Sequence, residues 1–439
     1  MPLPDIDFAC IRPDEGSRHS GFEELCAQLA SLEDRPAGAS FVRTGRGGDA
    51  GVECFLTLPN GDERGWQAKY VFDWDASLAV QLDKSVRAAV TKHPRLTELI
   101  VCLPFDLPDS RPARGKSARQ KWQAWKDRWE ETLASDGRIL RILLWGKSEL
   151  IGRLAIGSPD YAGRVYYWFG NEALTPSWFA EQFGKSRDAL GSRYTPHTNV
   201  ELPIRRDFLA FARDPYLEDT IQEWALGVAD RGGDALRALE RACAAGVRPP
   251  EIAALAATLA QVAQAFGADC VGPDRPFPLD DWKDSADACR AAVRAALTWV
   301  YSLPPSEARH GSRDEDWARE MLYKLGDLLS QIDDELSADA WRLANAKAVL
   351  LEGAAGTGKS HLLADVVEHQ VHAGRPAVLV LGSAFVEGDP WRQIMAQLDL
   401  PPDLQVKHFL ASLDAAAQAS GVRAMVCVDA INERHGPDI

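Results

Sequence analysis

The stretch Gly353-Ala-Ala-Gly-Thr-Gly-Lys-Ser360 follows an apolar run, Ala348 to Leu351, and a helical pattern begins within it at Lys359. A glycine-rich loop between a strand and a helix lets the backbone curl so that its N–H groups point at an anion, and the helix dipole favours negative charge there. A glycine turn that only caps a helix is the alternative. We predict that this part of the chain is an α/β unit built around a phosphate-binding loop.

The side chains of the loop fit the triphosphate of a nucleotide with Mg²⁺. Lys359 is expected to meet the β- and γ-phosphates, and Ser360 to ligate the metal ion. A second apolar strand, Ala424 to Val428, ends in Asp429, whose carboxylate would hold Mg²⁺ directly or through water. ATP, or GTP in its place, and Mg²⁺ are therefore the expected cofactors. The expected nucleotide-binding residues are Gly353, Gly356, Thr357, Gly358, Lys359, Ser360 and Asp429, of which Ser360 and Asp429 would bind the metal.

The residues after Asp429 leave hydrolysis open. Ala430 follows it instead of a glutamate that could orient water, and Glu433 is either a substitute for that glutamate or an acid that caps a helix. In P-loop folds of the additional-strand type, a strand later in the chain separates the two motif strands, and it has no counterpart here. We therefore expect residues 346–439 to be a P-loop NTPase domain truncated after the aspartate strand.

The N-terminal part alternates between helical and strand patterns. Apolar residues recur at helical spacing over Gly21 to Leu32, whereas Val52 to Leu58 and Gly65 to Phe72 are typical of two strands joined by the Asn60-Gly61 turn. Further helices are expected at 78–91 and 117–134, and further strands at 98–103 and 138–145. The alternation predicts an α/β domain with a mixed sheet.

Two neighbouring strands of this domain carry polar residues that can meet. Gln67 and Lys69 are two residues apart and so share a face, which Glu53 can reach across the hairpin. A carboxylate, a carbonyl oxygen and a lysine at one point would hold Mg²⁺ against a phosphodiester and activate water, with Glu53 and Gln67 as metal ligands. Glu23, in the first helix, would complete the metal shell. A surface ion pair is the alternative interpretation.

The order of these elements resembles a known nuclease family. The Phe22-Glu23 helix, the turn Gly48-Asp49-Ala50-Gly51-Val52-Glu53 and the strand Gln67-Ala68-Lys69 are similar to the Mrr-like branch of the PD-(D/E)xK restriction-endonuclease superfamily, over roughly residues 18–150. The resemblance implies a Mg²⁺-dependent endonuclease acting on double-stranded DNA. Glu53 stands where that family usually has aspartate, and Gln67 replaces the second acid. The catalytic residues implied are Glu53, Gln67, Lys69, Asp49 and Glu23.

A basic segment of this domain is the best local place for a DNA backbone. The net charge of −15 argues against a chain that coats nucleic acid through its overall field. Arg111 to Arg128, however, carries seven basic residues interleaved with Trp122, Trp125 and Trp129. The tryptophans recur at i, i+3 and i+7, which predicts that they pack into the core and leave the basic face to solvent or phosphate.

A helical connector is expected between the two α/β parts. The segment from Pro215 to Ala346 is rich in alanine and leucine, with breaks predicted at 231–234, 248–250 and 303–305. We predict three parts: a restriction-endonuclease-like effector domain over 1–170, a connector with an α-helical linker domain over 171–345, and the partial STAND- or AAA-like P-loop domain over 346–439.

This order of parts looks like that of the antiviral STAND NTPases of prokaryotes, the Avs family. The resemblance implies antiphage defence, in which a C-terminal region absent here senses a phage protein and the NTPase forms a homo-oligomer, a tetramer in that family, that activates the nuclease. Two alternatives remain. One is an NTP-dependent type IV restriction endonuclease, and the other is a nucleotide-switched module that binds DNA or protein without cutting.

The rest of the sequence indicates a cytoplasmic location. The N-terminus lacks the basic and apolar regions of a signal peptide, and no run of 18 apolar residues occurs, so no membrane partner is expected. The eight cysteines include no Cys-x-x-Cys pair, which predicts reduced thiols and no structural zinc.

Overall fold

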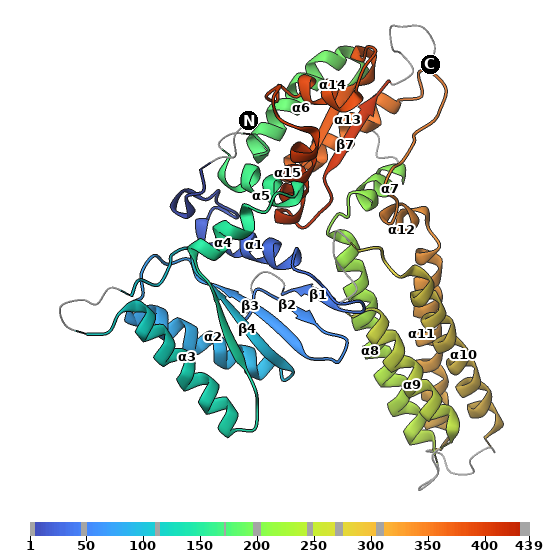
Figure 1. Cartoon of the computed structure of the whole chain (residues 1–439). Coiled ribbons are helices and arrows are strands. Elements are labelled where there is room, and N and C mark those ends of the chain that lie inside the picture. Colours follow the sequence, from blue (N-terminus) through green and yellow to red (C-terminus); the bar gives the residue numbers. More distant parts are fainter. Residues whose placement is uncertain are drawn as a thin grey trace. The chain divides into compact units, whose positions relative to one another are not determined.

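The computed structural model describes residues 5–44, 51–109, 115–170, 173–195, 203–243, 249–267, 275–303 and 311–430. The chain forms two compact units (Figure 1). The first comprises 1–189 with 370–420 and 426–439, and the second comprises 190–369 with 421–425. The sequence-predicted boundaries at 170 and 345 stay a prediction. No helix within the described ranges has both the length and the apolar character needed to cross a membrane.

A mixed five-stranded sheet lies at the centre of the first unit, in the order β1-β2-β3-β4-β5. The strands are β1 (Ser40–Arg43), β2 (Cys54–Thr57), β3 (Glu63–Ala68), β4 (Leu96–Cys102) and β5 (Arg141–Trp145). The pairs β1–β2 and β2–β3 are antiparallel, whereas β3–β4 and β4–β5 are parallel. The predicted hairpin is confirmed, with Gly61 at a φ of 82° in the turn, where a side chain would be strained. The predicted α/β class with a mixed sheet is also confirmed.

Helices cover both faces of this sheet. They are α1 (Arg18–Ser31), α2 (Ala76–Lys92) and α3 (Ala118–Ser135), whereas α4 (Lys147–Leu154), α5 (Pro159–Phe169) and α6 (Pro176–Leu190) follow β5 in the chain. Leu99 and Val101 of β4 pack in one core with α2 and α3, which lie side by side in Figure 1. Cys102 instead meets Cys26 of α1, because strand residues alternate between faces. This alternation places α1 opposite α2 and α3.

The tryptophans of α3 point inward, as predicted. Trp122 and Trp125 are about 6% and 5% exposed, and Trp129 packs against the same core. The indole Nε1 atoms of Trp125 and Trp129 donate to Asp83 Oδ1 at 2.8 and 2.7 Å, which satisfies their buried polar groups. Arg119, Lys121 and Arg128 of this helix remain exposed, and Arg128 also donates to Asp83 Oδ1 at 2.6 Å.

The first unit also contains a later group of elements. These are the two-stranded sheet of β6 (Ala377–Leu381) and β7 (Met425–Asp429), with α14 (Pro390–Gln397) and α15 (Val406–Ala419). Strand β7 agrees with the strand predicted over Ala424 to Val428. Ser186 of α6 donates to the carbonyl oxygen of Leu379 in β6. Short 3₁₀ helices occur in this unit at Phe8–Cys10 and Gly382–Ala384, and in the second unit at Gly191–Arg193.

The second unit is a helical bundle, as the alanine- and leucine-rich sequence predicts. Its helices are α7 (Pro203–Phe211), α8 (Tyr216–Ala242), α9 (Pro250–Ala265), α10 (Leu279–Ser302), α11 (Gly311–Leu336), α12 (Asp339–Ala344) and most of α13 (Lys359–His372). Helices α8 to α11 lie side by side (Figure 1), around a core that includes Trp224, Phe266, Trp282 and Trp341. Such aromatic pairs add about 0.5–1.5 kcal/mol each beyond the area they bury.

Two expectations about local structure are wrong. The break predicted at 231–234 does not occur, because α8 continues through it. A Cβ at Gly232 would lie 2.6 Å from Leu259 Cδ2, so this glycine permits close helix packing rather than a turn. The strand predicted over Ala348 to Leu351 is also absent, and Leu350 is 75% exposed. A strand needs a neighbour for its backbone hydrogen bonds, and no described strand pairs with this run.

Candidate functional site

Glu53 and Gln67 meet at the end of the central hairpin. The backbone N–H of Glu53 donates to the carbonyl oxygen of Trp66 at 2.7 Å, which places Glu53 beside β3 just before β2 begins. The side-chain Nε2 of Gln67 donates to Glu53 Oε1 and, at 3.1 Å, to the backbone carbonyl oxygen of Ala68. The antiparallel pairing of Cys54 with Trp66 sets this register, because it brings the residue before Cys54 next to the residue after Trp66.

The other candidate residues of the N-terminal domain lie around this pair. Lys69 follows β3, held by its N–H bond to the carbonyl oxygen of Cys102, and its positive charge acts on Glu53. Glu23 of α1 lies close enough for its negative charge to act on the same carboxylate. The structure therefore brings together Glu53, Gln67, Lys69 and Glu23. Asp49 lies outside the described residues, so its role stays a prediction.

The surroundings of Glu53 favour its protonated form. The pKa of Glu53 is raised from its usual 4.5 to about 7, chiefly because burial disfavours the carboxylate and further because of the negative charge of Glu23. Lys69, His19 and the Gln67 amide oppose this rise because each favours the charged form. A group that titrates near neutral pH in a partly buried cluster is typical of functional sites.

The sequence interpretation missed two groups that belong to the site around Glu53. His19 Nε2 lies 2.8 Å from Glu23 Oε1, and this hydrogen bond is the main cause that raises the pKa of His19. Their spacing of four residues on one helix is the signal that could have revealed them. The other group is the carbonyl oxygen of Ala68, which lies next to the Gln67 amide. A main-chain atom leaves no residue-type signal in the sequence.

The donor atoms at this site are oxygens. The carboxylates of Glu53 and Glu23, the amide oxygen of Gln67 after rotation of its amide group, and the Ala68 carbonyl would suit a hard divalent cation such as Mg²⁺. This chemistry fits the predicted metal. Across the described ranges, no three side chains of His, Cys, Asp or Glu gather as a metal-binding group.

Two glycines of the predicted phosphate loop adopt backbone angles in the left-handed region. Gly356 and Gly358 have φ angles of 79° and 86°, in the region that favours glycine, and a Cβ at either position would meet no atom within 4 Å. Thr357 Oγ1 donates to the carbonyl oxygen of Ala354 at 2.8 Å. Lys359 Nζ donates to the carbonyl oxygens of Gly353 and Ala354, both at 2.8 Å. The ammonium group is thus held over the loop by contacts that a phosphate could replace.

Side chains of the second unit hold the helix that begins at this loop. Tyr194 packs its ring 4.9 Å from that of His361, and its hydroxyl donates to Glu368 at 2.6 Å. Arg205 Nε lies 3.3 Å from Asp365 Oδ2 on the same helix. These contacts fix α13, and with it the N-terminus whose dipole would favour an anion.

The two predicted metal ligands of the nucleotide site belong to different units. Ser360 is in the first turn of α13 in the second unit, and Asp429 ends β7 in the first unit, where it is about 4% exposed. Their joint binding of Mg²⁺ stays a prediction. Glu433 lies outside the described residues.

Comparisons with known proteins add no relative: no protein-family model matches the sequence, and searches of curated proteins and of solved structures give no match. The resemblances drawn above therefore rest on the motifs and their spacing.

Proposed function

We propose that the chain is an NTP-regulated, Mg²⁺-dependent DNA endonuclease of the prokaryotic antiphage type, similar to the Avs STAND NTPases. The observation that supports this most is the group of Glu53, Gln67 and Lys69 at the end of a hairpin in a mixed sheet, with Glu23 beside them on α1. Each of these residues stands at a position of the Mrr-like nuclease pattern, with Glu53 in the place of the usual aspartate and Gln67 in the place of the second acid. The exposed basic side chains of α3 are candidates for contacts with a DNA backbone.

In this proposal, different residues of the chain bind the cation and orient the attacking water. Glu53, the Gln67 amide oxygen and the Ala68 carbonyl would hold the cation, with Glu23 completing its shell. Lys69 would orient the attacking water and balance the negative charge that grows on the phosphate. Bound Mg²⁺ would supply Lewis-acid polarisation of the phosphodiester. The Gln67 amide must turn over to do this, because it now donates to Glu53.

The nucleotide-binding part would regulate this activity. ATP at the loop of Gly353 to Ser360 would favour one assembly state of the chain, a homo-oligomer that is tetrameric by resemblance, by binding that state more tightly than the other. Regulation suits a cytoplasmic nuclease, since uncontrolled cutting would harm the cell. The ligand that triggers the assembly is, in this proposal, a phage protein.

One observation favours a second candidate. Gln67 is 3% exposed and already hydrogen-bonded to Glu53, which is also what a nucleotide-switched binding module without nuclease activity would show. The type IV restriction alternative uses the same nuclease and nucleotide sites. It differs from the defence proposal in its substrate, which would be modified DNA.

Plasmid cleavage by the full-length protein, with its sensing region, Mg²⁺ and ATP, tests these candidates. Cleavage that appears with phage lysate and is lost in Lys69→Ala supports the proposal, with Lys92→Ala, an exposed lysine at the end of α2, as the matched control. Cleavage only of methylated plasmid indicates the type IV alternative. Phage protection and DNA binding that survive Lys69→Ala, without cleavage in either protein, indicate the binding module.

A further inference from the structure

Helix α15 packs against α5 more closely than a side chain at the crossing would allow. A Cβ placed on Gly163 of α5 would lie 2.4 Å from both the carbonyl carbon and the Cβ of Ala411, and 2.7 Å from the N atom of Ser412. Real Cβ atoms essentially never come this close to other atoms. The contact therefore depends on a glycine at position 163, and one added methyl group would push the helices apart.

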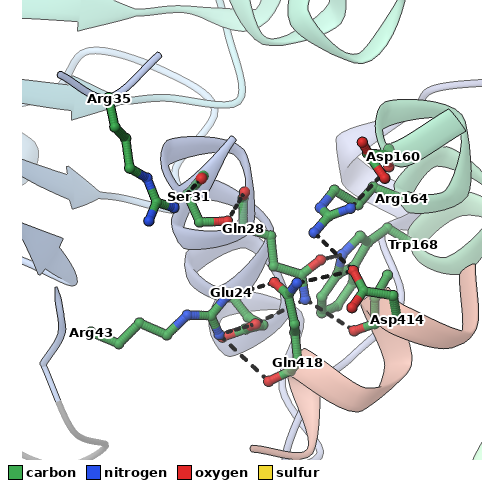
Figure 2. A network of polar contacts seen from close by, with 11 residues as sticks. Glu24, Gln28, Ser31, Arg35, Arg43, Asp160, Arg164, Trp168, Asp414 and Gln418 are labelled. Atoms are coloured by element: carbon green, nitrogen blue, oxygen red, sulfur yellow. Dashed lines mark hydrogen bonds and ion pairs between the residues drawn. The ribbon is translucent and has the colours of Figure 1, made fainter. Parts of the chain in front are cut away.

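A buried glutamine joins three helices at this contact (Figure 2). Gln28 of α1 is fully buried, and its Nε2 donates to the carbonyl oxygen of Ala415 in α15 at 3.1 Å. The same Nε2 donates to Glu24 Oε1 at 2.8 Å, and the Oε1 of Gln28 accepts from Trp168 Nε1 of α5 at 3.1 Å. Both ends of the buried amide are thus satisfied, which requires α1, α5 and α15 to be in place together.

Charged groups extend the network to β1. Arg43 Nη1 donates to Glu24 Oε1 at 2.6 Å, and its Nη2 donates to Gln418 Oε1 of α15 at 3.1 Å. Arg164, which is 1% exposed, lies 3.4 Å from Asp414 of α15. Figure 2 shows these side chains converging on one face of α15. Because these polar groups can be hydrated when the helices separate, such an interface can open at lower cost than an apolar one.

The elements bound to α15 are those that carry the candidate metal-binding carboxylates. Helix α1 bears Glu23 one residue before Glu24, and Arg43 of β1 pairs with Cys54, the residue after Glu53. These contacts are made by Ala415 and Gln418, near the C-terminal end of α15, and from this end the chain leads into β7, which ends at Asp429.

We propose that α15 is a positioning clasp, which fixes α1 and β1 and thereby the carboxylates of Glu23 and Glu53, and which links them to the strand that ends at Asp429. The proposal rests on the proposed function, since it assigns α15 a role at the proposed nuclease site. A movement of β7 would then change cation binding at the carboxylates that the clasp positions, and by linkage cation binding would also affect the position of β7.

The test is a substitution that adds one methyl group where α5 and α15 cross. Gly163→Ala keeps α5 a good helix but adds the clashing methyl group, whereas Gly184→Ala, on α6 with nothing within 4 Å of its Cβ position, is the matched control. Gln418→Ala, which removes the side-chain contacts with Arg43 and with Asp414, is a milder second variant in case Gly163→Ala prevents folding. All variants are made in the full chain.

Amide hydrogen exchange, without nucleotide or metal, reports on the clasp itself. We expect exchange in α1 and α15 to become about tenfold faster in Gly163→Ala, and a few times faster in Gln418→Ala, with α3 unchanged in both and no change in Gly184→Ala. If the exchange rates in α1 equal those of the wild type in both Gly163→Ala and Gln418→Ala, the proposal is overturned.

Titration with Mn²⁺, again without nucleotide, reports on positioning. We expect Gly163→Ala to bind Mn²⁺ about tenfold more weakly and Gly184→Ala to bind as the wild type does. Faster exchange in α1 with unchanged Mn²⁺ affinity means that α15 has only a structural role, which overturns the proposal. If Glu53→Gln binds Mn²⁺ as the wild type does, the proposed nuclease site fails, and the exchange result still decides whether α15 holds α1.

Discussion

The hairpin site and the phosphate loop contain similar kinds of groups but are built in opposite ways. At the hairpin, Glu53, Gln67 and Glu23 come from two strands and a helix, and the contacts of a complete sheet hold them together. At the loop, Lys359 and Thr357 bond to carbonyl oxygens within the same eight residues, while the run before it is exposed. One site depends on tertiary structure, whereas the other forms locally. Removing a side chain at the hairpin should therefore change cation binding, cleavage or stability there without changing ATP affinity, and the reverse should hold at the loop.

The largest effect is expected for Lys69→Ala. Loss of a charge that stabilises a transition state typically slows a reaction by 10²–10³-fold, so we expect DNA cleavage by the activated full chain to fall by about 10³-fold. ATP affinity should not change, because the loop makes its contacts locally. Rates of plasmid nicking and ATP titrations measure both quantities, with Lys92→Ala as the control. Equal cleavage rates for Lys69→Ala and the control would contradict a nuclease role for the hairpin site.

Glu53→Gln separates function from stability at the hairpin. The pKa of Glu53 in the folded chain is raised from 4.5 to about 7. Between these two pH values, the carboxyl group is therefore protonated in the folded chain and ionised in the unfolded chain. Stability is therefore lost as the pH rises through this window, by up to about 3 kcal/mol. The variant retains an amide oxygen for Gln67, so it should melt at a higher temperature than the wild type at pH 8 but not at pH 4.

Thermal melting of the full chain at both pH values measures this difference, and cleavage should be lost at each. Glu131→Gln, on an exposed position of α3, is the control and should leave the melting difference between the two pH values unchanged. A variant that melts lower than the wild type at pH 8 would contradict the burial that raises the pKa of Glu53.

A smaller effect is expected at the loop for Lys359→Ala. A hydrogen bond to a charged group contributes about 1.5–3 kcal/mol, so ATP affinity should fall by roughly 10–100-fold. Mn²⁺ binding at the hairpin, measured without nucleotide, should stay at the wild-type value. Lys347→Ala, an exposed lysine just before the loop, is the matched control. Unchanged ATP affinity in Lys359→Ala would show that the loop is only a glycine turn.

The same contrast explains what the sequence could and could not predict. Hydrophobic alternation and the Asn60-Gly61 turn located β2 and β3, because these signals are local. Their register then brought Glu53 to Gln67, as expected. The exposed run before the phosphate loop was mistaken for a strand, because strand formation depends on a partner that the pattern does not contain. Gly232 was mistaken for a break, since its close neighbour Leu259 belongs to another helix.

The smallest effect is expected for His19→Ala, and it tests how far the hairpin site extends. His19 is bonded to Glu23 at 2.8 Å, but its side chain is 48% exposed, and exposed ion pairs contribute at most about 1 kcal/mol. We therefore expect Mn²⁺ affinity to fall by no more than about fivefold, because Glu23 loses a partner that orients it rather than a ligand. His372→Ala, on α13, is the control and should bind Mn²⁺ normally. A loss as large as that of Glu53→Gln would place His19 among the metal ligands, and the hairpin site would then depend on α1 for two of its groups.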